Sequence, residues 1–337
     1  MALQDIVPLK IRVSLASAIL LGLTEGISSA NPTTIYLLTY RTGRCDANCS
    51  FCAQARSSTT SADRLSRVIW PEFSFRKVFS TMQKTEMKGI QRVCIQAMNY
   101  PNVFDEILAI IKVIHTEIKI PISISCQPLS IEQLKKLKEV GVDRVGIPLD
   151  VPTKTLFEQI KGTVIGGPYV WERSIEALRT AVQILGRGRV STHFIVGLGE
   201  SDEELMYTIQ KIVDMGVYPA LFAFTPLSGT REEQRVQPSL ERYRCIQLTR
   251  YLIVTGKSRL ENILFDKSGR IIGFDLNKDI IRKTVKSGIP FKTSGCPGCN
   301  RPFYNERAGG PFYNYPWRLR ETEINEVSSS IWRYLNG

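Results

Sequence analysis

Six short apolar runs, alternating with segments of helical spacing, constrain the fold of this 337-residue chain more than any other feature. The runs are rich in β-branched residues, and the segments between them place apolar residues three and four positions apart, as in Ile131, Leu134 and Leu137. This alternation predicts parallel strands joined by helical crossovers, which close into a barrel or part of one. The expected strands cover residues 33–40, 90–98, 121–126, 142–150, 190–200 and 218–230.

We therefore predict an α/β fold, a (β/α)6 partial TIM barrel with a C-terminal extension. Residues 1–32 are expected to form an N-terminal helical segment, 33–230 the barrel core, and 231–337 the extension. Within the extension, the pattern predicts a helix, a hairpin, a second helix and a Gly- and Pro-rich tail that cannot be a regular helix, at residues 240–254, 262–275, 278–288 and 293–321.

Composition limits where the protein can be located and which chemistry its side chains can support. Apolar residues make up 43% of the chain, and no run approaches the roughly 18 uninterrupted apolar residues of a membrane span. Lys10 and Arg12 interrupt the apolar N-terminal stretch, which therefore does not match an export signal. We expect a cytoplasmic protein without a membrane partner. Eight cysteines in a reducing compartment would be thiols available for metal binding.

Three of these cysteines, Cys45, Cys49 and Cys52, follow the first expected strand in one short loop. Loops at the carboxyl ends of barrel strands face the active site. Four thiolates saturate a tetrahedral zinc ion, whereas three thiolates on a [4Fe-4S] cluster leave one iron open to another ligand. The spacing favours such a cluster, and structural zinc is the alternative.

The C-x3-C-x2-C spacing after a first barrel strand is identified as that of the radical SAM superfamily. The resemblance implies that the open iron binds S-adenosylmethionine and that a 5'-deoxyadenosyl radical is formed. Phe51 matches the aromatic residue that contacts the adenine. Residues 193–200, "HFIVGLGE", resemble a second cofactor element, in which Ile195, Gly197 and Glu200 match. The element that holds the methionine amino group is not recognisable, and "QAMNY" stands in its place.

Several segments resemble biotin synthase in order and spacing. The resemblance implies cysteines on strands two, three and five around a second cluster; Cys94 and Cys126 are assigned to strands two and three, but Ser191 stands at the strand-five position. The tail contains "CPGC", with Cys296 and Cys299. Two barrel cysteines and two tail cysteines are expected to hold an auxiliary [4Fe-4S] cluster that donates sulfur.

The tail also resembles that of the two-protein lipoyl synthases of archaea and some bacteria. This implies sulfur insertion into an octanoyl chain carried on a lysine of a lipoyl domain or a glycine-cleavage H-type protein. A second radical SAM subunit and a ferredoxin-type electron donor are the other implied partners. The alternatives are a biotin synthase-like enzyme acting on a small molecule such as desthiobiotin, and a non-catalytic iron-sulfur scaffold.

Charge favours a protein partner over nucleic acid. The chain carries 44 − 32 = +12 charges, and nine Lys or Arg against four Glu after residue 280 give a local +5. An acidic carrier domain or ferredoxin would be attracted to a basic rim. No RNA-binding or zinc-finger signature accompanies the charge, so nucleic acid is not expected.

One more cysteine lies in the extension, and two residue groups of the tail have open interpretations. Cys245 is expected to be an ordinary buried helix cysteine. The tail aromatics either line an acyl channel or anchor the loop, and they are Phe303, Tyr304, Phe312, Tyr313 and Tyr315. Asn305, Glu306 and Arg307 either stabilise that loop or contact substrate.

Overall fold

A computed structural model describes residues 7–85 and 89–336. Its main feature is an eight-stranded sheet in the order β10-β9-β8-β7-β6-β2-β1-β5. Each neighbouring pair from β2 to β10 is parallel, whereas β1 pairs antiparallel with β2 and with β5. The parallel strands are β2 (Thr34–Leu38), β6 (Arg92–Gln96), β7 (Ile122–Ser125), β8 (Arg144–Gly146), β9 (Val190–Val196) and β10 (Tyr218–Ala223).

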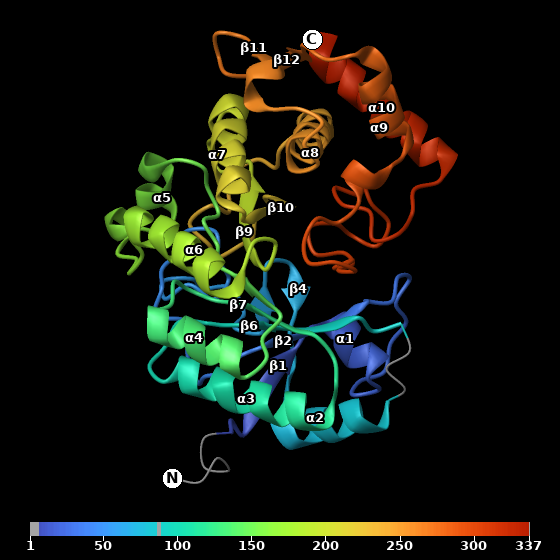
Figure 1. Ribbon diagram of the computed structural model, residues 1–337. Helices are drawn as coiled ribbons and strands as arrows, with labels where there is room; N and C mark the ends of the chain where they lie inside the picture. Colours follow the sequence, from blue (N-terminus) through green and yellow to red (C-terminus); the bar gives the residue numbers. More distant parts are fainter. Residues whose placement is uncertain (1–6, 86–88, 337) are drawn as a thin grey trace.

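The six predicted strands are therefore confirmed, and helices cover the outside of the curved sheet (Figure 1). The crossover helices are α2 (Phe75–Lys84), α3 (Val103–Glu117), α4 (Ile131–Glu139), α5 (Lys154–Ile160), α6 (Trp171–Leu185) and α7 (Asp202–Met215), with a 3-10 turn at Thr163–Ile165. Local sequence explains the boundaries: capping boxes at Ser130 and Ser201 begin α4 and α7, and Gly216 at a φ of +94° ends α7.

The N-terminal segment corrects the predicted helix. Its first six residues lie outside the described residues, and the rest contains strand β1 (Lys10–Val13) and a short helix, α1 (Leu15–Leu20). Ile11 and Val13 are fully buried, and β1 extends the sheet beyond β2. Tertiary pairing of these β-branched residues outweighs the helical character of the adjacent "LASAIL". Short strands β3 (Arg64–Leu65), β4 (Val68–Ile69) and β5 (Glu72–Ser74) follow the cysteine loop.

The C-terminal extension has the predicted helix, hairpin and second helix, and ends in a further helix that the sequence pattern did not indicate. These elements are α8 (Leu240–Val254), β11 (Ile263–Phe265), β12 (Ile271–Phe274), α9 (Lys278–Lys286) and α10 (Glu321–Asn336), with 3-10 turns at Leu260–Asn262 and Ile289–Phe291. A second hydrophobic cluster, separate from that of the barrel, joins α8, α9 and α10.

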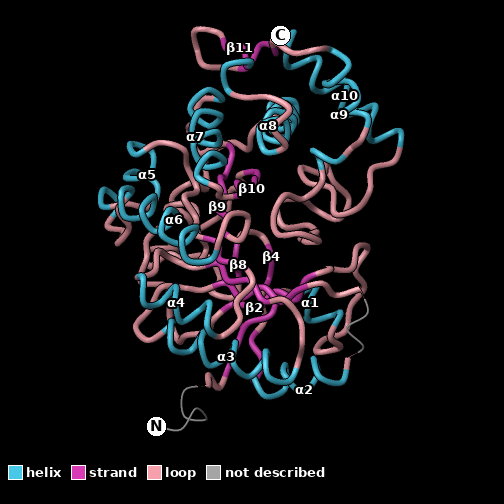
Figure 2. The backbone as a smooth tube through the Cα atoms, in the orientation of Figure 1, coloured by secondary structure: helices cyan, strands magenta, loops and turns pink. Residues whose placement is uncertain are grey.

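The tail between α9 and α10 lies along the open side of the partial barrel (Figure 2). On one side the Ser294 hydroxyl accepts a hydrogen bond from the Leu221 N–H of β10, and Asn305 donates to the Ala223 carbonyl. On the other side Asn300 accepts from the Thr33 N–H just before β2. The tail thereby bridges the two ends of the parallel array. None of the helices within the described ranges has both the length and the apolar character needed to cross a membrane.

Candidate functional site

A cavity of about 270 Å³ opens inside the barrel. Strand β9 shows how its wall is built: Ser191, His193 and Ile195 face the cavity, whereas Phe194 and Val196 are fully buried in the core. The cavity is lined by all seven cysteines that the sequence predicted as metal ligands, namely Cys45, Cys49, Cys52, Cys94, Cys126, Cys296 and Cys299. Phe51 and Ile195 also line it, so two of the four predicted cofactor residues reach the same space.

The loop with Cys45, Cys49 and Cys52 presents sulfur atoms to backbone N–H groups. The Asn99 N–H donates to Cys45 Sγ at 3.1 Å, and the loop is closed by a 3.0 Å bond from the Cys52 N–H to the Cys49 carbonyl. Burial raises the pKa of the Cys52 thiol to about 12, and the N–H of Gln54 opposes this rise. Buried sulfurs met by N–H donors suit iron-bound thiolates, and metal binding has to displace the thiol protons.

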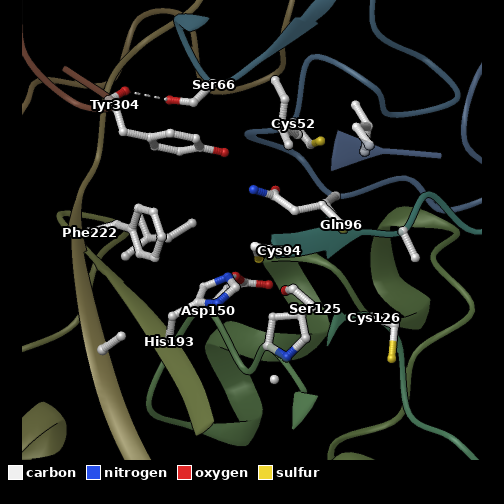
Figure 3. Close-up of a pocket in the computed structure, with 18 of the residues that line it drawn as sticks. Cys52, Ser66, Cys94, Gln96, Ser125, Cys126, Asp150, His193, Phe222 and Tyr304 are labelled. Carbon is white, nitrogen blue, oxygen red and sulfur yellow. Dashed lines mark hydrogen bonds and ion pairs between the residues drawn. The ribbon is translucent and has the colours of Figure 1, made fainter. Parts of the chain in front are cut away.

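A second group of thiols lies where strand β6 meets the tail: Cys94, Cys296 and Cys299. Burial raises the pKa of Cys94 to about 12, and the nearby thiols of Cys296 and Cys299 add to the rise. Cys126 stands apart: in Figure 3 its sulfur points away from Cys94, and burial alone raises its pKa, also to about 12. The structure thus brings together three of the four cysteines predicted for the auxiliary cluster, and not Cys126.

The arrangement of thiols suits clusters better than single ions. Within residues 7–85 and 89–336, no three His, Cys, Asp or Glu side chains surround one point closely enough to hold a lone metal ion. A zinc site requires ligands about 2.0–2.3 Å from one ion. An iron-sulfur cluster instead binds each thiolate at a different iron and spaces its ligands farther apart. The thiol-rich donor sets therefore fit iron-sulfur clusters.

Buried charges line the cavity beside the three-cysteine loop. Lys161 Nζ lies 2.6 Å from Asp150 Oδ2 and donates at 2.8 Å to the Pro148 carbonyl, while His193 Nε2 lies 2.9 Å from Asp150 Oδ1. Burial opposes ionisation of Asp150, but Lys161 and His193 outweigh it and hold its pKa well below the usual range. Lys161 in turn lowers the pKa of Cys49, against the larger rise caused by burial.

One tail aromatic reaches the cavity, and the others anchor the tail. Tyr304 lines the cavity, and Figure 3 shows its ring extending into it. Burial raises the pKa of the Tyr304 hydroxyl, and Cys52 and Cys94 both add to the rise, so this phenol lies near both thiol groups. The remaining aromatics pack against other rings, in the pairs Phe303–Trp317, Phe312–Trp317, Tyr313–Tyr243 and Tyr315–Phe312.

Two predicted cofactor residues, Gly197 and Glu200, have structural roles in this fold and do not line the cavity. Glu200 accepts hydrogen bonds from the N–H groups of Gly197 and Leu198, at 2.8 and 2.9 Å, and pairs with Arg242 at 3.0 Å. Gly197 has a φ of +107°, and a Cβ there would lie 2.9 Å from Pro238. The backbone of Gly197 therefore packs closely against the protein itself. Gly197 and Glu200 together hold the turn after β9.

Sequence reasoning missed several residues of the site. Asp150 ends the predicted strand 142–150, and this position at a carboxyl strand end was an available signal. Lys161 had no such signal, because tertiary packing alone places it, whereas Tyr304, left open between channel and anchor, does line the cavity. Glu306, left open between two roles, is buried and accepts hydrogen bonds from the Asn305 and Asn314 N–H groups, which stabilises the tail. Cys245 is buried in α8, as expected.

Comparisons with known proteins agree with this geometry. A biotin synthase from Nostoc sp. is 27% identical over 235 residues, covering 66% of this chain and 65% of the relative. Biotin synthase 2 from Corynebacterium diphtheriae is 27% identical over 238 residues, covering 66% of each. The chain thus spans just under two thirds of the length of these relatives.

Solved structures show the same fold at low identity. Methylornithine synthase superposes with a TM-score of 0.52 at 16% identity, covering 66% of this chain and 62% of the other. The [FeFe]-hydrogenase maturase HydG gives 0.51 at 16% identity, covering 71% and 54%. The family model of the radical SAM superfamily matches residues 39–212, more than half of the chain. The chain is similar to biotin synthases and belongs to the radical SAM superfamily, whose enzymes use a [4Fe-4S] cluster and S-adenosylmethionine.

Proposed function

We propose that this protein is a sulfur-inserting radical SAM enzyme and one subunit of a two-protein lipoyl synthase. Its substrate would be an octanoyl chain amide-linked to a lysine of a lipoyl domain or H-type carrier protein. The observation that carries the proposal is that two groups of thiols face one cavity: Cys45, Cys49 and Cys52 on the loop after β2, and Cys94, Cys296 and Cys299 between β6 and the tail. Sulfur insertion requires a radical source and a sulfur source that can reach the same carbon.

When bound, the two clusters and S-adenosylmethionine would supply a 5'-deoxyadenosyl radical and a sulfide. The chain's own residues shape the space for that chemistry. Ile195 and Phe222 contribute apolar surface on the β9–β10 wall, and Tyr304 enters from the tail. Apolar walls exclude water from a reactive carbon and suit an alkyl chain. The tail closes the open side of the barrel and so forms one wall of the site. It also contributes two of the sulfur ligands.

The same geometry separates this proposal from a biotin synthase acting on a free metabolite. Ser191, which faces the cavity from β9, replaces the cysteine that the biotin synthase pattern places on strand five. The tail motif "CPGCNRPFYNERAGGPFYNYP" instead resembles the two-protein lipoyl synthases. The proposed partners are the octanoylated carrier, a second radical SAM subunit and a ferredoxin-type reductant.

Product mass tests the proposal. The protein is reconstituted anaerobically with iron and sulfide and supplied with S-adenosylmethionine and dithionite. It is incubated with an octanoyl-lysyl peptide or desthiobiotin, with and without a candidate second subunit. We expect a thiolated octanoyl peptide. Thiolation of desthiobiotin alone would contradict the assignment, and release of 5'-deoxyadenosine without any thiolated product would favour another radical reaction.

A tail variant separates the two clusters. Cys296→Ala/Cys299→Ala is expected to release 5'-deoxyadenosine but to form no thiolated product, because the three-cysteine loop stays intact. Cys245→Ala removes a buried cysteine outside the cavity and serves as the matched control, with sulfur insertion retained. Sulfur insertion by the double variant would refute the role of the tail.

A further inference from the structure

We propose that Ser123, and not Cys126, completes the ligand set of the auxiliary cluster, beside the thiols of Cys94, Cys296 and Cys299. The inference rests on the proposed function only in requiring a second cluster at this place. It assigns the fourth position to a hydroxyl on β7, three residues before the cysteine that the sequence pattern selected.

The first observation is the register of the parallel sheet. Tyr36 on β2 pairs with Cys94 on β6, Cys94 pairs with Ser123 on β7, and Ser123 pairs with Arg144 on β8. Partners in register point to the same face of a sheet, and neighbouring strands lie about 4.8 Å apart. All four residues of this row line the cavity. The β7 residue beside Cys94 is thus Ser123.

Ser123 lies on the wall of the same cavity as the thiols. Its strand register puts it beside Cys94, and both residues line the cavity together with Cys296. Ser123 is itself 3% exposed, and its hydroxyl donates one long hydrogen bond, 3.4 Å, to the Val93 carbonyl. One buried hydroxyl beside Cys94 thus faces the cavity that the tail thiols also line.

Cys126 does not share these contacts. It lies beyond the end of β7, where its N–H donates to the Gly146 carbonyl. Figure 3 shows its sulfur on the far side of Ser125 from Cys94, pointing away. No other thiol contributes to its pKa, which is raised by burial alone. Cys126 lines the same cavity, but its sulfur would have to reorient to meet the tail cysteines.

The charges around the row suit an oxygen ligand. Arg144 pairs with Ser123 in the register and lines the cavity, and it shares one carboxylate, Asp143, with Arg92, so the three side chains keep a net positive charge. Ser123 would bind iron through Oγ after releasing its proton to solvent or a base, without any change in oxidation state. A cationic surrounding stabilises the alkoxide and the thiolates together. The expected donor set is three sulfurs and one oxygen.

Spectroscopy of a chain that assembles only the auxiliary cluster tests this. The background variant Cys45→Ala/Cys49→Ala/Cys52→Ala is reconstituted anaerobically and should bind about four irons. Adding Cys126→Ala should leave the iron content and the EPR spectrum of the reduced cluster unchanged. Adding Ser123→Ala should lower iron to about three or fewer, and Ser123→Cys should keep about four irons with a shifted spectrum.

Loss of iron in the Cys126→Ala variant would overturn the assignment, as would an unchanged spectrum in both Ser123 variants. Ser123→Cys guards against a folding defect, because it restores a ligand of similar size. Absence of iron from the background variant would remove the auxiliary cluster and the proposed function together. If the iron results hold but no lipoyl product forms, the ligand set stands and only the proposed function fails.

Discussion

Replacing Lys161 by Met should destabilise the fold far more than replacing an exposed lysine. Lys161 and Asp150 are each 4% exposed and lie 2.6 Å apart. Met fills nearly the same volume, so little cavity is created, but the Asp150 carboxylate loses its closest cation. Breaking a buried ion pair by removing one partner costs about 3–5 kcal/mol. We expect the free energy of unfolding to fall by about that amount at pH 7.

The pH dependence of the free energy of unfolding gives a second test of the Lys161–Asp150 pair. Lys161 and His193 hold the pKa of Asp150 well below its unfolded value of about 3.9. Its contribution to stability is therefore fully present above about pH 4 and is lost as the pH falls through the folded-state pKa. In the Lys161→Met variant, the lysine no longer offsets the effect of burial on Asp150, and the pKa of Asp150 rises. The stability difference between wild type and variant should be largest near pH 7 and should shrink toward pH 4.

Urea unfolding of the anaerobically reconstituted protein, followed by far-UV circular dichroism, measures these differences. Lys154 is the control, since its pair with Glu172 is more than half exposed, and Lys154→Met should cost far less than Lys161→Met. The double variant Asp150→Asn/Lys161→Met should lose less than the sum of the two single variants, because no unpaired charge is left. Equal losses for Lys161→Met and Lys154→Met, or strict additivity, would refute this reasoning.

Two other predictions concern the sulfur site and the β9 turn. Tyr36 Oη lies 3.1 Å from Cys299 Sγ and accepts from the Arg301 N–H, so its own proton is directed at the sulfur. Tyr36→Phe should lower the reduction potential of the proposed auxiliary cluster by roughly 20–65 mV, the equivalent of one hydrogen bond of about 0.5–1.5 kcal/mol. An EPR-monitored redox titration checks this, with exposed Tyr207→Phe as the control, and an unchanged potential would count against it. Glu200→Ala should lower the unfolding free energy by about 3 kcal/mol or more, because Arg242 and two N–H groups lose their acceptor. The control is Glu203→Ala on the exposed face of α7. A similarly small loss in both variants would contradict the role of Glu200 in holding the turn.

Much of the fold was predictable because its signals are local. Alternating apolar runs and helical spacing located all six parallel strands, and the cysteine spacing located a loop that does face the cavity. Strand β1 was missed because "KIRV" is short and lies next to residues that favour a helix. Its strand conformation depends on pairing with β2 and β5, which lie far away in sequence.

The sequence by itself determined which chemistry this chain can support, because the thiols, their spacing and the strand pattern are properties of short segments. Tertiary structure decided which of those groups meet. Strand register placed Ser123 beside Cys94, and the tail brought Cys296, Cys299 and Tyr304 across more than a hundred residues to the open side of the barrel. Strand register and the docking of the tail follow from the packing of the whole core. That packing puts Ser123 next to Cys94, while Cys126, three residues further along the chain, points away.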